Sequence, residues 1–293
     1  MTYAITGASG QLGRLTAAQL LQRVDPAEVV LFSRTPAALS EFAERGVTVR
    51  PLDFADPASL PEAFAGVDRL LLISTDAVGV RLEQQRGAID AAKAAGVQHV
   101  LYTSVPGTVE DNPAMVVPDH LGTEEHLRAS GLGWTFLRNN LYADLQLDGL
   151  RHAAQSGQLV TNAGDGVVAY VTRADCAAAA AGALASETTD AAYDITGPHA
   201  YSPADLAAIA AGIGGSPVEV VAVDDAAFTA GLVGAGLPEP FAELLASFGA
   251  SAREGFLADV TTAVHDLAGV EPAALDTLLQ DRPGSRTHPG PLS

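Results

Sequence analysis

Three glycines near the N-terminus have the spacing that points most directly to chemistry. Gly7, Gly10 and Gly13 follow an apolar segment in the pattern G-x-x-G-x-x-G. Such glycines let the backbone turn tightly and approach a pyrophosphate, whose charge is stabilised at a helix N-terminus. A simple tight turn between a strand and a helix would use the same residues. The strand–helix–strand context favours a dinucleotide site. Its expected residues are Gly7, Ser9, Gly10, Gln11, Leu12 and Gly13.

The end of the second expected strand bears on which dinucleotide binds. It reads Phe32-Ser33-Arg34-Thr35 and contains no acidic residue. NAD enzymes use an Asp or Glu in this place to bind the ribose 2′-hydroxyl, whereas NADP enzymes often have an Arg. Arg34 can stack on adenine and pair with a 2′-phosphate through two hydrogen bonds. The alternative is an ordinary surface arginine at a strand end. We therefore expect NADP(H) rather than NAD(H).

Further candidates stand where later strands end. They are Asp53, Phe54, Ser74, Thr75, Thr103 and Ser104. Ligands of open α/β sheets bind outside the carboxyl ends of the strands, so these side chains are expected along the cofactor path. Each polar one among them also suits a helix cap, and Asp53 would cap a helix that begins at Pro57.

The chain has one lysine and one cysteine, and both counts exclude chemistry. Lys93 is not preceded by glycine, which excludes a P-loop. No tyrosine stands four residues before it, which excludes the Tyr-x-x-x-Lys pair of standard short-chain dehydrogenases. Cys176 cannot form an internal disulfide or a Cys-based metal cage, and its alanine neighbours suggest a small core residue. The histidines show no ligand spacing, so we expect no metal.

The first 140 residues alternate strand-like and helix-like segments. Expected strands cover residues 3–6, 29–32, 47–50, 70–73, 100–103 and 134–137; expected helices cover 11–24, a segment from 36, 57–65, 81–95 and 118–130. The apolar runs fit parallel strands that are covered on both faces. Repeated units of this kind predict an α/β fold with a doubly wound parallel (Rossmann) sheet over residues 1–140.

The pattern loosens after Arg138. We expect residues 141–280 to form a smaller, mainly helical lobe on the substrate side, with some segments returning to the sheet. Asp165-Gly166 suggests a hairpin turn between residues 159–160 and 167–171. Ser202 and Pro203 suit the N-cap and first position of a helix. Residues 281–293 resemble a flexible tail.

Composition limits location and partners. The 293 residues include 16 basic and 35 acidic ones, a net charge of −19 that would repel phosphate backbones and argues against direct nucleic-acid binding. The longest apolar run, residues 176–185, is about half of the ~20 residues that a membrane span needs. No basic leader precedes an apolar segment at the N-terminus. We expect a cytoplasmic protein without membrane contact.

These residues together resemble the NmrA-like branch of the atypical short-chain dehydrogenases, and within it the type 2 NAD(P)H:quinone oxidoreductases. The matching stretches are Ile5–Gly13, Leu71–Ser74, Ala91–Val97, Tyr102–Ser104, His120 with Thr123-Glu124, Leu137–Asn139, Ala163–Gly166 and Thr172–Asp175. The glycine motif is shared by many families, but the later stretches in this order are more specific. The resemblance runs to about Leu279.

The resemblance implies an NADP-binding Rossmann domain, a smaller C-terminal lobe and a cleft between them. The family is divided in function. Some members reduce quinones or related conjugated acceptors, and others bind a dinucleotide without catalysis and act as redox-sensing regulators. The expected function is NADPH-dependent hydride transfer to a quinone-like acceptor, with the sensor as the alternative. A homo-oligomer is compatible with either.

The catalytic candidates are His120, Asn139 and Tyr142. By the resemblance, His120 and Glu124 take the place of the standard Tyr and Lys, and Glu124 would orient His120 or raise its pKa. A solvated His–Glu pair is the alternative. Reduction of a quinone gives a phenolate, whose conjugate acid has a pKa of about 10, so little proton donation is needed.

We expect Asn139 and Tyr142 to form a second wall of the acceptor site. Its roof would come from Phe228, Phe241 or Phe248. Arg138 suits either the site or a structural ion pair.

Overall fold

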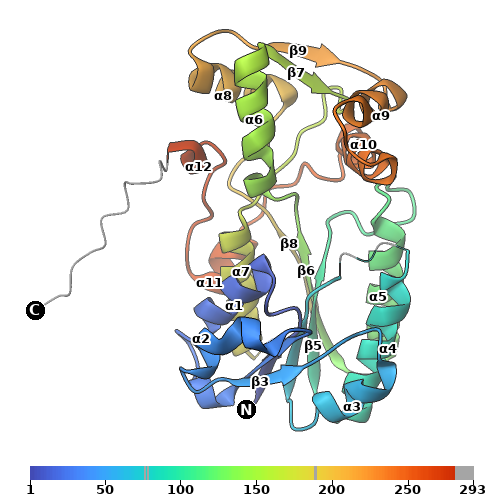
Figure 1. The fold of residues 1–293 in the computed structure, drawn as a ribbon, viewed down its shortest axis with the longest axis vertical. Helices are drawn as coiled ribbons and strands as arrows, with labels where there is room; N and C mark the ends of the chain where they lie inside the picture. Colours follow the sequence, from blue (N-terminus) through green and yellow to red (C-terminus); the bar gives the residue numbers. More distant parts are fainter. Residues whose placement is uncertain (76, 78, 188–189, 281–293) are drawn as a thin grey trace, which may run out of the picture.

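The computed structural model describes residues 1–75, 77, 79–187 and 190–280, and Figure 1 shows a sheet flanked by helices with a smaller lobe above it. In these residues seven parallel strands pair in the order β3-β2-β1-β4-β5-β6-β8. They are β1 Tyr3–Ile5, β2 Val29–Ser33, β3 Thr48–Pro51, β4 Arg69–Leu72, β5 His99–Ser104, β6 Gly133–Asn139 and β8 Ala191–Ile195. The direction of the strand order reverses at β1, where open α/β sheets bind ligands outside the strand ends. The predicted doubly wound sheet is confirmed.

Helices cover both faces of this sheet. They are α1 Gln11–Leu20, α2 Ser40–Ala43, α3 Leu60–Ala63, α4 Arg81–Ala94, α5 Val117–Ala129, α7 Arg173–Ala185 and α11 Ala263–Ala268. Strand side chains alternate between faces. Leu101 and Leu137 therefore join the core cluster that contains residues of α1, α7 and α11, whereas Tyr102 and Phe136 join the cluster formed with α4 and α5. The strands β2, β4 and β5 are therefore buried on both sides, whereas the edge strands β3 and β8 are partly exposed.

The alanine-rich helix α7 is buried along nearly its whole length because its small side chains allow neighbouring helices to come close. A Cβ added to Gly182 would lie 1.9 Å from the carbonyl oxygen of Leu267 in α11. Cys176 on this helix is 1% exposed, and burial raises the pKa of its thiol. The prediction that Cys176 is a core residue is confirmed.

The lobe contains α6 Gln146–Ser156, β7 Gln158–Thr161, α8 Pro203–Gly214, β9 Glu219–Ala222, α9 Asp225–Gly234, α10 Glu239–Arg253 and α12 Thr277–Gln280. The predicted hairpin is wrong. Asp165-Gly166 does lie in a turn, with the Gly166 N–H donating to the Ala163 carbonyl oxygen at 2.9 Å. Strand β7, however, pairs in parallel with β9, which begins at Glu219. A local turn signal cannot report a partner that distant in the sequence.

Most predicted elements of residues 1–140 are present with small shifts at their ends. The first helix ends at Leu20 rather than at residue 24. The helices expected from residues 36 and 57 begin as 3₁₀ turns, Pro36–Leu39 and Pro57–Ser59, before α2 and α3. The predicted cap of α8 is confirmed, since Ser202 Oγ accepts the Asp205 N–H at 3.2 Å.

Later segments return to the sheet, as expected. Helix α7 packs on α1, and β8 pairs with β6. The tail expected at residues 281–293 lies outside the described residues. In the described part of the chain, every helix is too short or too polar to cross a bilayer.

Candidate functional site

The glycine loop joins β1 to α1, and its geometry requires glycine at two positions. Gly7 has a φ of 60°, in the left-handed region that side chains rarely occupy. A Cβ on Gly13 would lie 2.4 Å from the Gly7 carbonyl oxygen and 2.7 Å from the Cα of Ala8. The turn therefore lies directly against the first turn of α1. Gly10 is less crowded, with 3.3 Å from an added Cβ to the same oxygen.

The N-terminus of α1 is left open to a ligand. Its N-cap is Gly10, so no side chain accepts from the first N–H groups, and the first turn has no acidic residue. Unsatisfied N–H groups and the helix dipole together favour an anion. Ser9 fixes the loop, because its hydroxyl accepts from Ser33 Oγ of β2 at 2.9 Å. Gln11 is exposed beside the loop, whereas Leu12 points into the core.

Arg34 follows β2 directly beside the glycine loop. The Ala8 N–H donates to the carbonyl oxygen of Phe32 at 3.0 Å, which holds loop and strand together. Arg34 is exposed and, among the described residues, its guanidinium has no hydrogen bond or ion pair. This side chain is thus able to reach an anionic group beside the loop.

Asp53 and Phe54 follow β3 on the same edge. Asp53 Oδ1 accepts the Ala55 N–H at 3.0 Å, which bends the chain locally. Asp53 is not the cap of the helix at Pro57, whose N-cap position is Asp56. Phe54 is half-buried against the core on the α4 side.

Hydroxyl groups link the ends of β4 and β5. The Ser74 N–H donates to Thr103 Oγ1 at 2.8 Å, and Thr103 Oγ1 donates to Ser74 Oγ at 3.2 Å. Thr75 Oγ1 lies 3.4 Å from Gln84 Oε1. Ser104 is turned toward α5 instead. The structure therefore brings Ser74 and Thr103 together at the sheet edge, as the sequence suggests.

His120 is a buried residue between α5 and the sheet. It is 3% exposed, and its Nδ1 lies 2.8 Å from Tyr102 Oη. Burial, and then the positive charge of Arg81, lower the pKa of His120 to about 3. The expectation that Glu124 orients His120 or raises its pKa is wrong, because Glu124 is directed to arginines and to Ser104. His120 is therefore neutral at physiological pH.

The buried neutral state of His120 makes stability depend on pH. In the unfolded chain the imidazole binds a proton below its ordinary pKa of 6.5, whereas the folded protein resists protonation until the pH nears 3. The stabilisation is complete above pH 6.5 and is lost as the pH falls toward 3, by about 1.4 kcal/mol per pH unit. We expect urea unfolding between neutral pH and about pH 4 to show a steeper loss for the wild type than for His120→Gln.

His152→Gln is the matched control, because His152 is an exposed histidine on α6. Its stability profile should run parallel to that of the wild type. His99, whose pKa is lowered to about 4 mainly by burial, contributes equally in all three proteins. Parallel profiles for the wild type and His120→Gln would contradict the burial argument.

Glu124 is the centre of a buried charge cluster. The carboxylate is fully buried and accepts from Arg138 Nε at 2.9 Å and from Arg138 Nη2 at 2.7 Å. Ser104 Oγ donates to it at 2.7 Å, and the half-exposed Arg128 at 3.1 Å. Glu124 raises the pKa of Arg138 through these hydrogen bonds. Arg138 is thus the structural ion-pair partner that the sequence allowed.

Asn139 and Tyr142 lie on the other face of the sheet. Tyr142 packs against the cluster of α1 and α7, with the Arg173 guanidinium 4.7 Å from its ring centroid. Burial raises the pKa of Tyr142. Asn139 is 8% exposed, and its Oδ1 is buried without a hydrogen-bond partner. Because strand side chains alternate, the structure does not bring His120 together with these two residues.

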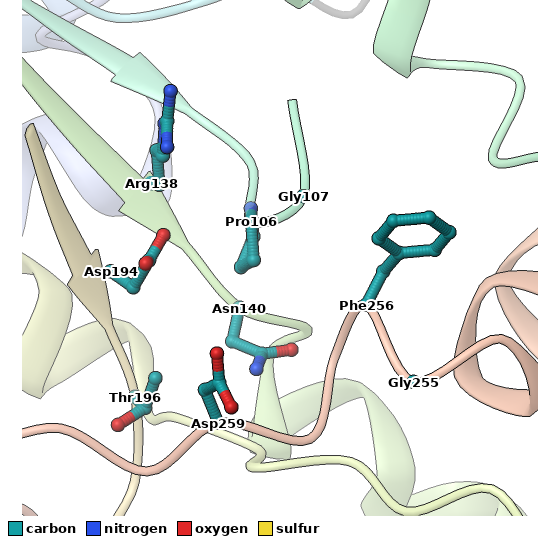
Figure 2. A pocket seen from close by; sticks show the side chains of 9 residues that line it. All are labelled: Pro106, Gly107, Arg138, Asn140, Asp194, Thr196, Gly255, Phe256 and Asp259. Atoms are coloured by element: carbon teal, nitrogen blue, oxygen red, sulfur yellow. The ribbon is translucent and has the colours of Figure 1, made fainter. Parts of the chain in front are cut away.

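A cavity of about 260 Å³ opens where β5, β6 and β8 end (Figure 2). Its lining residues are Pro106, Gly107, Arg138, Asn140, Asp194, Thr196, Gly255, Phe256 and Asp259. Among the described aromatic residues Phe256 alone lines it, so the predicted roof of Phe228, Phe241 or Phe248 is wrong for this cavity. Sequence reasoning missed Asp194, Phe256 and Asp259, because no local motif marks them.

The residues present fit a dinucleotide. The uncapped N-terminus of α1 and the exposed Arg34 suit its phosphates. The orphaned Oδ1 of Asn139, the last residue of β6, suits an amide N–H donor.

Comparison with known families agrees with this geometry. A family model described as NAD(P)H-binding matches residues 7–187, more than half of the chain. The chain is 38% identical to quinone oxidoreductase 2 of Escherichia coli strain K12, over 91% of this chain and 93% of that protein. It is 28% identical to an NAD(P)H azoreductase of Xenophilus azovorans, over 90% and 92% of the two chains.

Solved structures show the same fold. The NADPH complex of the E. coli NADPH-dependent quinone oxidoreductase QOR2 superposes with a TM-score of 0.91 at 36% identity, over 95% of this chain and 99% of that one. The NADP(H) complex of Citrobacter sp. triphenylmethane reductase gives 0.87 at 34% identity, over 96% and 99%. The chain therefore belongs to the NAD(P)H-binding, NmrA-like family of atypical short-chain dehydrogenases.

Proposed function

We propose that the protein is an NADPH-dependent oxidoreductase that transfers a hydride to a quinone or a similar conjugated acceptor. The observation that carries the proposal is the shared location of two features. The open N-terminus of α1 and the 260 Å³ cavity both lie at the carboxyl edge of the same sheet. The names of the relatives, a quinone oxidoreductase and an azoreductase, support this acceptor class.

The chain's own residues would hold the cofactor along this edge. The N–H groups at the start of α1 would bind the pyrophosphate, and Arg34 would bind the 2′-phosphate and stack on the adenine. Ser74 and Thr103, hydrogen-bonded to each other, would lie beside the nicotinamide half. Asp53 and Phe54 would border the adenine. The bound cofactor supplies the hydride.

The surroundings of the catalytic candidates favour an acceptor that needs little help with protons. A quinone leaves as a phenolate whose conjugate acid has a pKa of about 10, so position and orientation can supply most of the rate. His120 as a proton donor stays a prediction, and its buried neutral state gives that role no support. Asn139 and Tyr142 are proposed to contact the nicotinamide or the acceptor carbonyl.

The function is tested by menadione reduction, followed by the loss of the near-ultraviolet absorbance of NADPH. We expect turnover with NADPH and a higher KM with NADH, because only NADPH offers a 2′-phosphate to Arg34. Arg34→Ala should raise the KM for NADPH by about 10- to 100-fold, the worth of a charge-assisted pair of about 1.5–3 kcal/mol. It should raise the KM for NADH by only about two- to fivefold, because NADH loses the stacking of Arg34 on the adenine but has no 2′-phosphate to lose.

Arg45→Ala is a suitable control, since Arg45 is an exposed arginine outside the proposed site. Equal loss with both cofactors in Arg34→Ala would contradict the assignment of Arg34. If no quinone is reduced and the oxidised cofactor binds more tightly than the reduced one, the protein is instead a dinucleotide sensor.

A further inference from the structure

The side chains that line the cavity at the ends of β5, β6 and β8 carry more negative than positive charge. Among its lining residues the charged side chains are Arg138, Asp194 and Asp259, one positive and two negative. Figure 2 shows them entering from three elements, with Arg138 on β6, Asp194 on β8 and Asp259 on the segment that follows α10. A ligand in this cavity therefore meets carboxylates from two separate parts of the chain.

The positive charge of Arg138 is already matched. Two of its three guanidinium nitrogens, Nε and Nη2, donate to the two oxygens of Glu124 at 2.9 and 2.7 Å. Glu124 is fully buried behind Arg138 and cannot turn to solvent. Bidentate pairs of this kind are geometrically fixed. Arg138 is thus held in place. Because the half-exposed Arg128 also pairs with Glu124, two arginines stand against the carboxylates of Glu124, Asp194 and Asp259, and these five charges sum to −1.

Asp194 has an unused acceptor. Its Oδ1 is buried without a hydrogen-bond partner, although Asp194 pairs in register with Arg138 across β6 and β8. A buried carboxylate oxygen without a donor is costly, and a ligand N–H or O–H would relieve that cost. Burial is the main cause that raises the pKa of Asp194; Asp259 and Glu124 add to it, and Arg138 opposes it.

We infer that this cavity selects acceptors by charge, admitting neutral or cationic conjugated molecules and rejecting anionic ones through Asp194 and Asp259. The inference rests on the proposed function, because it takes the cavity as the acceptor site. The apolar part of the lining, Pro106 and Phe256, would contact a planar ring and discriminate little between charges. The whole-molecule charge of −19 acts in the same direction but is screened by salt, as is the exposed Asp259, whereas the partly buried Asp194 is screened less.

The test uses three naphthoquinones with the same ring: the unsubstituted compound, a sulfonate and a trimethylammonium derivative. Binding to the cofactor-free protein is measured by calorimetry, and kcat/KM is measured with NADPH. We expect the sulfonate to be at least about tenfold poorer than the neutral compound in both measurements, as two like charges a few ångströms away require. The cationic compound should equal or exceed the neutral one.

Two variants test whether the carboxylates in the cavity cause the preference among quinones of different charge. Asp259→Asn and Asp194→Asn should each raise sulfonate binding by about three- to tenfold relative to the neutral quinone, and weaken the cationic one. Asp148→Asn is the matched control, because it removes the same net charge from a fully exposed side chain on α6. Far-ultraviolet circular dichroism verifies that each variant is folded.

Equal affinities for the three quinones, or an equal effect of Asp148→Asn, would overturn the inference while leaving the reductase function intact. A second outcome also separates the charge selection by the cavity from the reductase function. If the charge order appears in binding but no quinone is reduced, the cavity selection stands and the proposed function fails.

Discussion

Replacing Gly13 by alanine is expected to weaken NADPH binding by about 10- to 100-fold. The added Cβ would lie 2.4 Å from the Gly7 carbonyl oxygen and 2.7 Å from the Cα of Ala8, and both are backbone atoms that cannot rotate away. The loop must move relative to α1, at a cost of about 1–3 kcal/mol. That cost falls on the conformation that holds the pyrophosphate, so it appears in the Kd. Calorimetric titration with NADPH measures it.

Gly87→Ala is the matched control for this prediction. Gly87 lies inside α4, and an added Cβ there would meet no atom within 4 Å. Alanine is the better helix former by about 1 kcal/mol, so this variant should be slightly more stable and should bind NADPH like the wild type. Unchanged NADPH affinity in a folded Gly13→Ala protein would refute the proposed role of the glycine loop.

Breaking the Glu124 cluster is expected to have the largest effect on stability. In Arg138→Met the fully buried carboxylate of Glu124 loses two hydrogen bonds and its bidentate cation. Ser104 and the half-exposed Arg128 remain as partners and offset part of the loss. Removing one member of a buried pair costs about 3–5 kcal/mol. We expect the free energy of unfolding in urea to fall by about 3 kcal/mol.

Two further variants show whether the unpaired charge is the cause. Arg151→Met removes an exposed arginine from a surface ion pair with Asp148 and should cost less than about 1 kcal/mol. The double variant Glu124→Leu/Arg138→Met should be more stable than Arg138→Met alone, because it removes the uncompensated carboxylate as well. A double variant that is less stable than Arg138→Met would mean that packing, not charge, dominates.

The local pattern of the sequence was enough to predict the sheet and the glycine loop. Apolar runs such as Leu70–Leu72 become strands that are buried on both faces, and a parallel sheet covered by helices requires that pattern. The glycine spacing is likewise a local requirement. The turn places Gly7 at a positive φ, and the helix that follows leaves no room for a Cβ on Gly13. These features depend on neighbours within a few residues, which a sequence displays directly.

Other sites could not be read in this way, because their partners are far apart in the chain. The i, i+4 spacing of His120 and Glu124 suggested a pair, yet the carboxylate binds the stronger cation of Arg138 from β6. Asp165-Gly166 signalled a turn, but the partner of β7 is the strand beginning at Glu219. The spacing of residues in the sequence shows which side chains are able to meet. The packing of the folded chain determines which of them are in contact.

The sequence by itself determined that the protein has a doubly wound sheet, an N-terminal glycine loop before the first helix, an arginine after the second strand and no Tyr–Lys pair. Only the tertiary structure decided that His120 is buried and neutral, that Glu124 pairs with Arg138, and that Asp194 and Asp259 share one cavity. The physical reason is that burial and electrostatic partnership are set by contacts across the whole chain. Local periodicity and turn chemistry, by contrast, are set by each segment's own residues.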